Sequence, residues 1–412
     1  MVKDISKMQI IMLSNLYPYC GEPFLSTEVE FLPQGLDLDI CPFFTGTNEF
    51  DEGKLSPQIH VNRYSMPSLF ERVMCFFRGL KVLFSENEFR TAMCKKQPIR
   101  NIAKALKFAC ISEYRLLSIS KRVLYRRVDF DDNNLVIYAY WMYETAYVGA
   151  RLKSLFPSST FISRCHGYDL YGERHVNGYL PFRKFILDQA DLICPISENG
   201  KQYLHDCFAG KYDEKISVMR LGTIRKFEIA ETQDREDCTV LVSCSNLADV
   251  KRVHLIINAL KKCKSKIAWY HFGDGDLRTS LEKQAEELPE NIKYEFMGYQ
   301  ANEDIQRFYA EHYIDAFLNV SKSEGVPVSI MEAESYGIPI IATNVGGTSE
   351  IVHDGENGVL LNSNFTDEEF LSAIDDVVKK AERYRSEALH TWETMCNARE
   401  VYPKFYEKLA KL

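Results

Sequence analysis

The chain has 412 residues, of which 46% are hydrophobic, 12% aromatic and 26% charged. This length exceeds one ordinary hydrophobic core and predicts two folded domains of roughly 100–200 residues each. The formal net charge of −8 gives no reason to expect nucleic acid as a partner. The 12 cysteines form no Cys-x-x-Cys pair and lie near no histidine cluster, so we expect reduced thiols rather than disulfides or a metal site.

The first residues, MVKDISKMQIIMLSNLYP, lack the basic, apolar and small-residue succession of a signal peptide. No stretch of the chain reaches the ~18 apolar residues that a membrane span requires. We therefore expect a cytoplasmic protein, with peripheral contact with the inner face of the membrane as an open alternative.

Apolar segments of strand length alternate with amphipathic helices, which is typical of a doubly wound α/β fold. In the first half, buried strands are expected at 9–15, 135–141, 160–166 and 191–197. In the second half they are expected at 238–245, 266–273, 292–298, 314–320 and 338–344. We interpret the polar stretch 224–237 as the interdomain linker. The predicted organisation is an N-terminal domain over 1–228, a C-terminal domain over 229–394, and a helix over 395–412 that packs back on the first domain.

Residues 63–127 contain no convincing strand and carry 15 basic and four acidic residues, a net charge of +11. Bulky apolar residues are interleaved with the basic ones over 70–84. Such a helical insertion in the N-terminal domain fits contact with an anionic membrane surface. The alternative is a solvated insertion whose apolar stripe packs on the first sheet.

The most informative segment is IDAFLNVSKSEGVPVSIMEAESYGIPIIATNVGGTSEIVHDGENGVLL, residues 314–361. It predicts a strand, a tight loop and a short helix that starts after Pro327 and is capped by Gly337. Such a helix start points free N–H groups into the ligand crevice of a parallel sheet. Glu324 in the loop and Glu332 on the helix would face that crevice. Two carboxylates there would repel a bare diphosphate but could hold sugar hydroxyls, and a nucleotide sugar offers both groups.

This arrangement and its flanks closely resemble the large retaining glycosyltransferase family four, whose two Rossmann-like domains face each other across a cleft (the GT-B fold). SCSNLADVKRVHLIINAL, HFGDGDLRTSLEKQA, SRCHGYDLYGER and NLYPYCGEPFLSTEVEFL extend the resemblance in weaker form over nearly the whole chain. The resemblance implies a nucleotide-diphosphate sugar as co-substrate, retention of anomeric configuration, and no cofactor or metal ion.

The resemblance also implies roles for particular residues. Glu332 would hold the ribose hydroxyls and Glu324 hydroxyls of the donor sugar. His166 would reach the donor sugar near the reacting centre. The remaining donor contacts would come from Lys251 with Arg252 at the diphosphate, backbone N–H groups of Gly325 and Val326, and the loop at Gly298 and Tyr299 near the base.

One position departs from the family pattern, because the second phosphate-binding arginine falls on Ser245 or Asn246. Asn246 is accordingly retained as a donor-site residue. Gly21 is a candidate for the diphosphate or acceptor loop, and Asp169, Tyr168 and Arg174 are candidates for acceptor contact. The acceptor itself is expected to be a glycan or a lipid-linked oligosaccharide in bacterial surface polysaccharide synthesis.

Two Asp-x-Asp patterns, at 37–39 and 274–276, match the motif of metal-dependent glycosyltransferases, but three-residue patterns recur by chance. Gly273-Asp274-Gly275 could begin a nicotinamide fingerprint, yet Arg278 occupies its third glycine position. The competing functions are a sugar-nucleotide epimerase or a phosphorylase on the same architecture, and a non-catalytic scaffold. An epimerase would need no acceptor, and a phosphorylase would carry a cofactor lysine.

Overall fold

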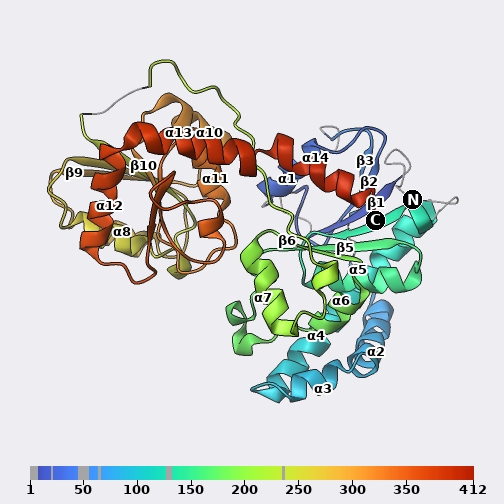
Figure 1. The fold of residues 1–412 in the computed structure, drawn as a ribbon. Helices are drawn as coiled ribbons and strands as arrows, with labels where there is room; N and C mark the ends of the chain where they lie inside the picture. Colours follow the sequence, from blue (N-terminus) through green and yellow to red (C-terminus); the bar gives the residue numbers. More distant parts are fainter. Residues whose placement is uncertain (1–7, 20–21, 45–54, 64–65, 127–131, 234–236) are drawn as a thin grey trace. The chain divides into compact units, whose positions relative to one another are not determined.

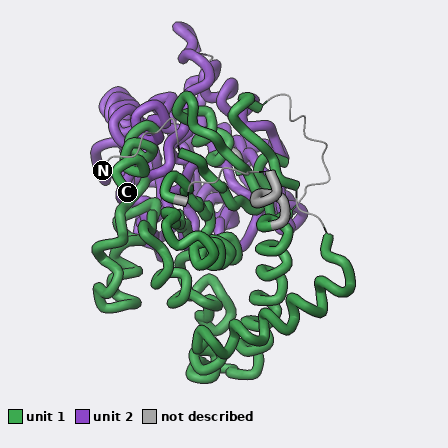
Figure 2. The backbone as a smooth tube through the Cα atoms, turned by 90° about the vertical axis from the view of Figure 1, so that its right-hand side faces the viewer, with its two compact units in different colours: residues 1–219, 403–412 green, residues 220–402 purple. Residues whose placement is uncertain are grey.

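A computed structural model describes residues 8–19, 22–44, 55–63, 66–126, 132–233 and 237–412 of the chain. The chain divides into two compact units, with residues 1–219 and 403–412 in unit 1 and residues 220–402 in unit 2 (Figure 2). The segment 403–412 thus belongs to unit 1, although it follows unit 2 in the chain.

The described part of unit 1 is built on a six-stranded parallel sheet in the order β3-β2-β1-β4-β5-β6 (Figure 1). Its strands are β1 (Gln9–Ser14), β2 (Asp37–Pro42), β3 (Ile59–Val61), β4 (Leu135–Ala139), β5 (Thr160–Cys165) and β6 (Leu192–Pro195). Its helices are α1 (Pro23–Glu30), α2 (Leu69–Ser85), α3 (Glu88–Met93), α4 (Pro98–Arg126), α5 (Glu144–Leu155), α6 (Arg183–Gln189) and α7 (Glu198–Phe208). The strand order reverses between β1 and β4, where Met12 pairs with Ile40 on one side and Tyr138 on the other.

In its described residues, unit 2 repeats this topology with a six-stranded parallel sheet in the order β12-β11-β10-β7-β8-β9. The strands are β7 (Thr239–Cys244), β8 (Ile267–Phe272), β9 (Ile292–Gly298), β10 (Ala316–Asn319), β11 (Ile340–Thr343) and β12 (Gly358–Leu361). The helices are α8 (Val253–Leu260), α9 (Arg278–Ala285), α10 (Asn302–Glu311), α11 (Val328–Glu334), α12 (Asp367–Lys379) and α13 (Ala381–Thr391), followed by α14 (Ala398–Leu409), which runs on into unit 1. Here the order reverses between β7 and β10.

The nine predicted strands are all present, and each forms part of one of the two sheets. The fold class is therefore confirmed as two α/β units with parallel sheets. Strands β2, β3 and β12 are not among these nine, and β3, with three residues, is too short to show a strand period. The basic insertion is helical as expected, and its α2, α3 and α4 pack on one another (Figure 1).

The structure moves the expected boundaries. Unit 1 ends at residue 219 rather than 228, and the polar stretch 224–237 lies in unit 2 rather than acting as a linker. Its first residues are tied there by hydrogen bonds, since the Arg225 side chain donates to the Ser335 carbonyl at 3.2 Å and the Lys226 N–H to Gln306 Oε1 at 3.0 Å. Polar composition alone therefore did not mark the boundary.

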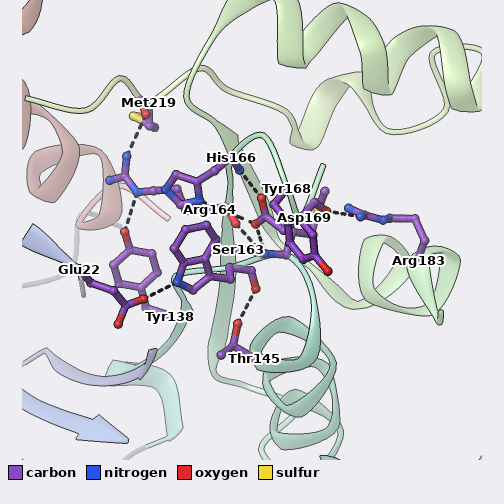
Figure 3. A network of polar contacts seen from close by, with 12 residues as sticks. Glu22, Tyr138, Thr145, Ser163, Arg164, His166, Tyr168, Asp169, Arg183 and Met219 are labelled. Carbon is purple, nitrogen blue, oxygen red and sulfur yellow. Dashed lines mark hydrogen bonds and ion pairs between the residues drawn. The ribbon is translucent and has the colours of Figure 1, made fainter. Parts of the chain in front are cut away.

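A buried arginine organises the carboxyl end of the first sheet. The side chain of Arg164, on β5, is fully buried and forms an ion pair with Glu28 of α1 at 3.0 Å. It also donates to Tyr138 Oη and to the Met219 carbonyl, each at 2.8 Å (Figure 3). The ring of Phe405, in α14, covers the guanidinium at 4.7 Å. The Arg164 side chain thus connects β5 with β4, with α1 and with α14. It also connects β5 with Met219, the last residue of the segment 1–219.

We expect Arg164→Met to destabilise unit 1 by about 3–5 kcal/mol, because it leaves the buried Glu28 carboxylate without its partner. The double variant Glu28→Gln with Arg164→Met removes both charges and should recover much of that loss. Urea unfolding, followed by hydrogen exchange in peptides from β4 and β5, measures the effect. Equal unfolding midpoints for wild type and the single variant would contradict this account.

Candidate functional site

Two loops of unit 2 meet at the point where its strand order reverses. One follows β7 and the other follows β10, and ligands of open α/β sheets bind at such a switch point. The Lys322 N–H donates to the Val250 carbonyl at 2.7 Å, which joins the loops through their backbones. The residues predicted to bind the donor, Lys251 and Glu324, lie on these two loops.

Lys251 and Glu324 are in direct contact. The Lys251 ammonium donates to Glu324 Oε1 at 2.7 Å, and Asn319 Nδ2, at the end of β10, lies 3.5 Å from the same oxygen. Glu324 is 9% exposed, whereas about a quarter of the Lys251 side chain is exposed. The sequence placed these groups in one site, and the structure adds that each neutralises the other.

Arg252 does not have the phosphate-binding geometry that the sequence suggested. Its guanidinium donates to the carbonyls of Val320 at 2.8 Å, Ser363 at 2.7 Å and Ser321 at 3.2 Å. Its backbone has φ +51° at the start of α8, a conformation that is uncommon for a side-chain-bearing residue. Arg252 therefore fastens the loop after β10 to the loop after β7, and this structural role replaces the predicted phosphate contact.

The loop that carries Glu324 is held against a glycine turn. Gly346 has φ +57°, and a Cβ atom there would lie 2.0 Å from the Glu324 carbonyl oxygen, so no side chain fits. The next residue, Gly347, donates its N–H to the Gly325 carbonyl at 2.7 Å. Val326 is buried. The conformation of the Glu324–Val326 backbone is therefore set by the Gly-Gly pair that the sequence contains after β11.

Glu332 lies on α11, which starts after Pro327 and ends before Gly337, as predicted. Its Oε1 accepts a hydrogen bond from Asn302 Nδ2, at the start of α10, at 2.7 Å. Burial raises the pKa of the Glu332 carboxyl to about 7, although the Asn302 hydrogen bond acts in the opposite direction. A carboxyl with this pKa is poised to change its charge near neutral pH.

Cys244, at the end of β7, connects Glu332 with the ion pair. Burial and the charge of Glu332 raise the pKa of the Cys244 thiol to about 12, and the charge of Lys251 acts to lower it. Both charged groups therefore act on the same half-buried thiol. The two predicted donor-site residues Asn246 and Tyr299 are exposed, and Tyr299 is 84% exposed beside Gly298, whose φ is +70°.

In unit 1, His166 follows β5, and its ring lies close to three aromatic rings. Its ring centroid is 4.4 Å from that of Trp141, 5.2 Å from Tyr140 and 5.9 Å from Phe24. Within the described residues neither ring nitrogen has a hydrogen-bond partner, and Nδ1 is 3.7 Å from Asp169 Oδ2, too far for a hydrogen bond. A buried imidazole in this state has capacity for a ligand.

Asp169 holds the loop rather than facing an acceptor, which corrects its predicted role. It is 1% exposed, and its carboxylate accepts the backbone N–H groups of Met142 at 2.6 Å and His166 at 2.7 Å. Burial acts to raise its pKa, but the neighbouring His166 side chain and the N–H groups of His166 and Met142 outweigh burial, so the pKa is lowered. Arg183 donates to its carbonyl oxygen (Figure 3).

Of the other N-terminal candidates, Tyr168 is 57% exposed and Arg174 is half-buried. Gly21 lies outside the described residues. Within those residues, no group of three or more His, Cys, Asp or Glu side chains is arranged to hold a metal ion. The first Asp-x-Asp pattern is in β2, where Asp39 is buried and accepts a hydrogen bond from Asn62 at 3.0 Å.

Several residues that support these sites were not predicted from the sequence. Glu22 accepts hydrogen bonds from the Trp141 indole and from the N–H groups of Leu16 and Tyr17, and so fixes the wall beside His166. Asn302 and Asn319 orient the two glutamates in unit 2. Glu22 and Asn302 act across 119 and 30 residues, whereas Asn319 is five residues from Glu324. Only their positions next to strand ends or helix starts could have singled them out.

Residues 224–388 match the family model described as glycosyl transferases group 1. The chain is 33% identical over 143 residues to the O-antigen biosynthesis glycosyltransferase WbnH of Escherichia coli, covering 35% of this chain and 38% of that one. It is 26% identical over 215 residues to the putative colanic acid biosynthesis glycosyltransferase WcaL of Escherichia coli K12, covering 48% and 50%. The chain thus matches at most about half the length of these relatives.

A longer match, 22% identical over 372 residues and 86% of each chain, is to the amylovoran biosynthesis glycosyltransferase AmsK of Erwinia amylovora. Among solved structures, the chain is similar to Anabaena HepE, crystallised with UDP and glucose, with a TM-score of 0.68, 16% identity and coverage of 98% and 100%. It is also similar to a mutant of S. aureus TarM, with a TM-score of 0.68, 12% identity and the same coverage. The chain therefore resembles the glycosyl transferases group 1 family over residues 224–388 and has the two-domain GT-B fold.

Proposed function

We propose that this chain is a retaining, metal-independent glycosyltransferase that moves a hexose or related sugar from a nucleotide-diphosphate sugar to an acceptor hydroxyl. The observation that carries the proposal is the contact between Lys251 and Glu324 at the switch point of unit 2, with Glu332 on the helix that follows the Glu324 loop. A cation and two carboxylates at this position match the parts of a nucleotide sugar, which has one anionic diphosphate between two polyols.

In the proposed donor complex, Lys251 contacts the diphosphate, Glu332 accepts hydrogen bonds from the ribose hydroxyls, and Glu324 accepts them from the donor sugar. The N–H groups of Gly325 and Val326 face the donor, and Tyr299 lies near the base. His166 contributes from unit 1 to the donor sugar. The ion pair with Glu324 holds the Lys251 ammonium in position for the incoming diphosphate, so that little reorganisation is needed.

The proposed reaction is a displacement at the anomeric carbon. The acceptor oxygen forms a bond to that carbon while the bond from the carbon to the diphosphate oxygen breaks. The acceptor proton passes to the departing diphosphate, whose negative charge Lys251 stabilises. Attack on the same face as the leaving group gives retention. NMR of the product measures the anomeric configuration, and an inverted product would refute this step.

The acceptor is proposed to be a glycan or lipid-linked oligosaccharide of a bacterial surface polysaccharide. The names of the similar proteins support this class, since they act in O-antigen, colanic acid and amylovoran biosynthesis. A nucleotide-diphosphate sugar as donor is in line with the similar HepE structure, which contains UDP-glucose. Turnover that requires an acceptor would separate this function from that of an epimerase, which needs none.

The donor site is tested by calorimetric titration of nucleotide sugars, without added metal, into wild type and Glu332→Ala. We expect one donor to bind wild type selectively and to bind the variant roughly ten- to a hundredfold more weakly, because hydrogen bonds to a charged group are lost. Glu290→Ala, which changes an exposed glutamate of unit 2, serves as the matched control. Equal affinities in wild type and Glu332→Ala would remove Glu332 from the site.

The raised pKa of Glu332 predicts a pH dependence of donor binding. Ribose hydroxyls donate to the ionised carboxylate, so donor affinity should rise as the pH increases through about 7 and fall roughly tenfold for each pH unit below it. Glu332→Gln should give a flat profile between pH 5 and 8. Asn302→Ala should move the midpoint upward, since the Asn302 hydrogen bond lowers this pKa. A midpoint unaffected by both changes would contradict the assignment.

We also propose that the insertion α2–α4 contacts an anionic membrane. The α2 side chains that the alternative reading would bury on the sheet include several that are exposed, among them Leu69 at 78%, Phe70 at 77% and Phe77 at 63%. Exposed basic side chains, including Arg72, Arg78 and Lys81, lie on the same helix. Among the described helices none is both long and apolar enough to cross a bilayer, so the contact would be at the surface.

Vesicle flotation tests this contact. Wild type should float with vesicles that contain anionic lipid and should be released by salt, which screens the basic side chains. Phe70→Ser with Phe77→Ser should reduce flotation, whereas Leu155→Ser, which changes an exposed leucine of α5, should not. Flotation that is equal on neutral lipid, or absent altogether, would count against the proposal.

A further inference from the structure

A cavity lies in unit 1, between α4 and the segment that follows β5. Its volume is about 480 Å³, which is within the range of sites for small ligands. The cations on its wall are Arg100, Lys104, Lys107 and Arg174, and no aspartate or glutamate of the described chain lines it. In a chain with a net charge of −8, a cavity lined by four cations and no acid marks a place for negative charge.

Three of the cations come from one face of α4, and the fold brings the fourth to the opposite wall. Arg100, Lys104 and Lys107 have the spacing i, i+4, i+7 and therefore share one face of α4. Arg174 comes from the short helix Gly172–Arg174 on the other wall. Lys104 is held in place by its hydrogen bond to the Tyr179 carbonyl at 2.7 Å. Burial and the neighbouring Arg100 lower its pKa, as expected where cations are brought together.

Aromatic rings form the rest of the wall. Tyr143, Tyr168 and His175 line the cavity, and the ring of His175 is 4.5 Å from that of Tyr168 and 5.4 Å from that of Tyr143. His175 Nε2 also contacts the Tyr168 carbonyl oxygen at 2.6 Å, which fixes the pair. Aromatic faces offer the apolar surface on which the C–H face of a sugar ring can pack.

The cavity adjoins the loop that carries His166. Tyr168 belongs to this loop, whose backbone is held by Asp169, and it is 57% exposed (Figure 3). Asn177 also lines the cavity and has φ +64°, a conformation uncommon outside glycine. Its amide donates to Asn101 Oδ1 at 3.4 Å and to Gln97 Oε1 at 3.2 Å, so α4 and the opposite wall are fastened together.

We propose that this cavity binds the phosphorylated end of a saccharide acceptor, with the cations on the phosphate groups and the tyrosines on the sugar. This inference rests on the proposed glycosyltransferase function and names the class of its acceptor. The positive charge of four cations is larger than the charge of −1 that a single carboxylate carries. A phosphate monoester carries a charge of about −1.5 to −2 at neutral pH. An arginine guanidinium can donate two parallel hydrogen bonds to the oxygens of a phosphate group. The phosphate could be part of a lipid-linked diphosphate or of a soluble sugar phosphate.

Binding of glucose 1-phosphate, inorganic pyrophosphate and methyl glucoside is measured by NMR titration in a Lys251→Met background, so that the proposed donor site does not contribute. We expect glucose 1-phosphate to bind more tightly than the other two probes. Arg100→Gln with Lys107→Gln should weaken it at least tenfold, and Tyr168→Ala should weaken the sugar phosphate but not pyrophosphate. Lys201→Gln, which changes an exposed lysine of α7, should leave binding unaltered.

Three results would overturn the proposal. Equal affinity for pyrophosphate and glucose 1-phosphate would make the cavity a simple anion site. Binding that survives the Arg100→Gln and Lys107→Gln changes would place the ligand elsewhere. Loss of anionic-vesicle binding in these variants, with no binding of glucose 1-phosphate, would assign the cations to membrane headgroups. Donor titration of the double variant with Lys251 intact should give wild-type affinity, and absence of donor binding in wild type would count against the proposed function alone.

Discussion

Parallel pairing of the strands is the constraint on which the sites in this protein depend. Because every strand of a sheet runs the same way, all loops that follow the strands gather at one edge, and the reversal of strand order opens a gap there. Both units have this order. In unit 2 the gap brings together Lys251 and Glu324, which are 73 residues apart. In unit 1 the pairing of β4 with β5 brings the residues after these strands to the same edge, where Trp141 lies beside His166.

The sequence predicted those parts of the fold and the site that are encoded locally. Central strands such as β1 and β4 are continuous apolar runs because both faces of a parallel sheet are buried. Glu324, Glu332 and the Gly-Gly turn lie in one segment, and their spacing is set by a loop and a helix of known period. Lys251 was found by resemblance to a family motif, and its contact with Glu324 emerged only from the fold.

Other predictions failed because they concern partners that are distant in sequence. Arg252 and Asp169 have the residue types of ligand-binding groups, but Arg252 is engaged by carbonyl groups from two other loops and Asp169 by backbone N–H groups. Nothing in a linear pattern distinguishes a charge aimed at a ligand from one aimed at the chain itself. The same limit applies to the insertion. The apolar stripe of a helix does not reveal which of its apolar side chains are buried by the rest of the protein. Phe77 is exposed and Leu83 is buried, although both are apolar residues of α2.

The return of residues 403–412 to unit 1 affects how the molecule is made. A ribosome synthesises unit 2 before it supplies Phe405, so the nascent first sheet has the Tyr140 ring near the Arg164 guanidinium but not the Phe405 ring that covers it. Until then a cation that is fully buried in the finished protein lacks one of its walls. Completion of the first unit is thereby tied to emergence of the second from the ribosome. A gene truncated after residue 219 would encode an incomplete first unit, and the two halves could not be exchanged between relatives by a single crossover.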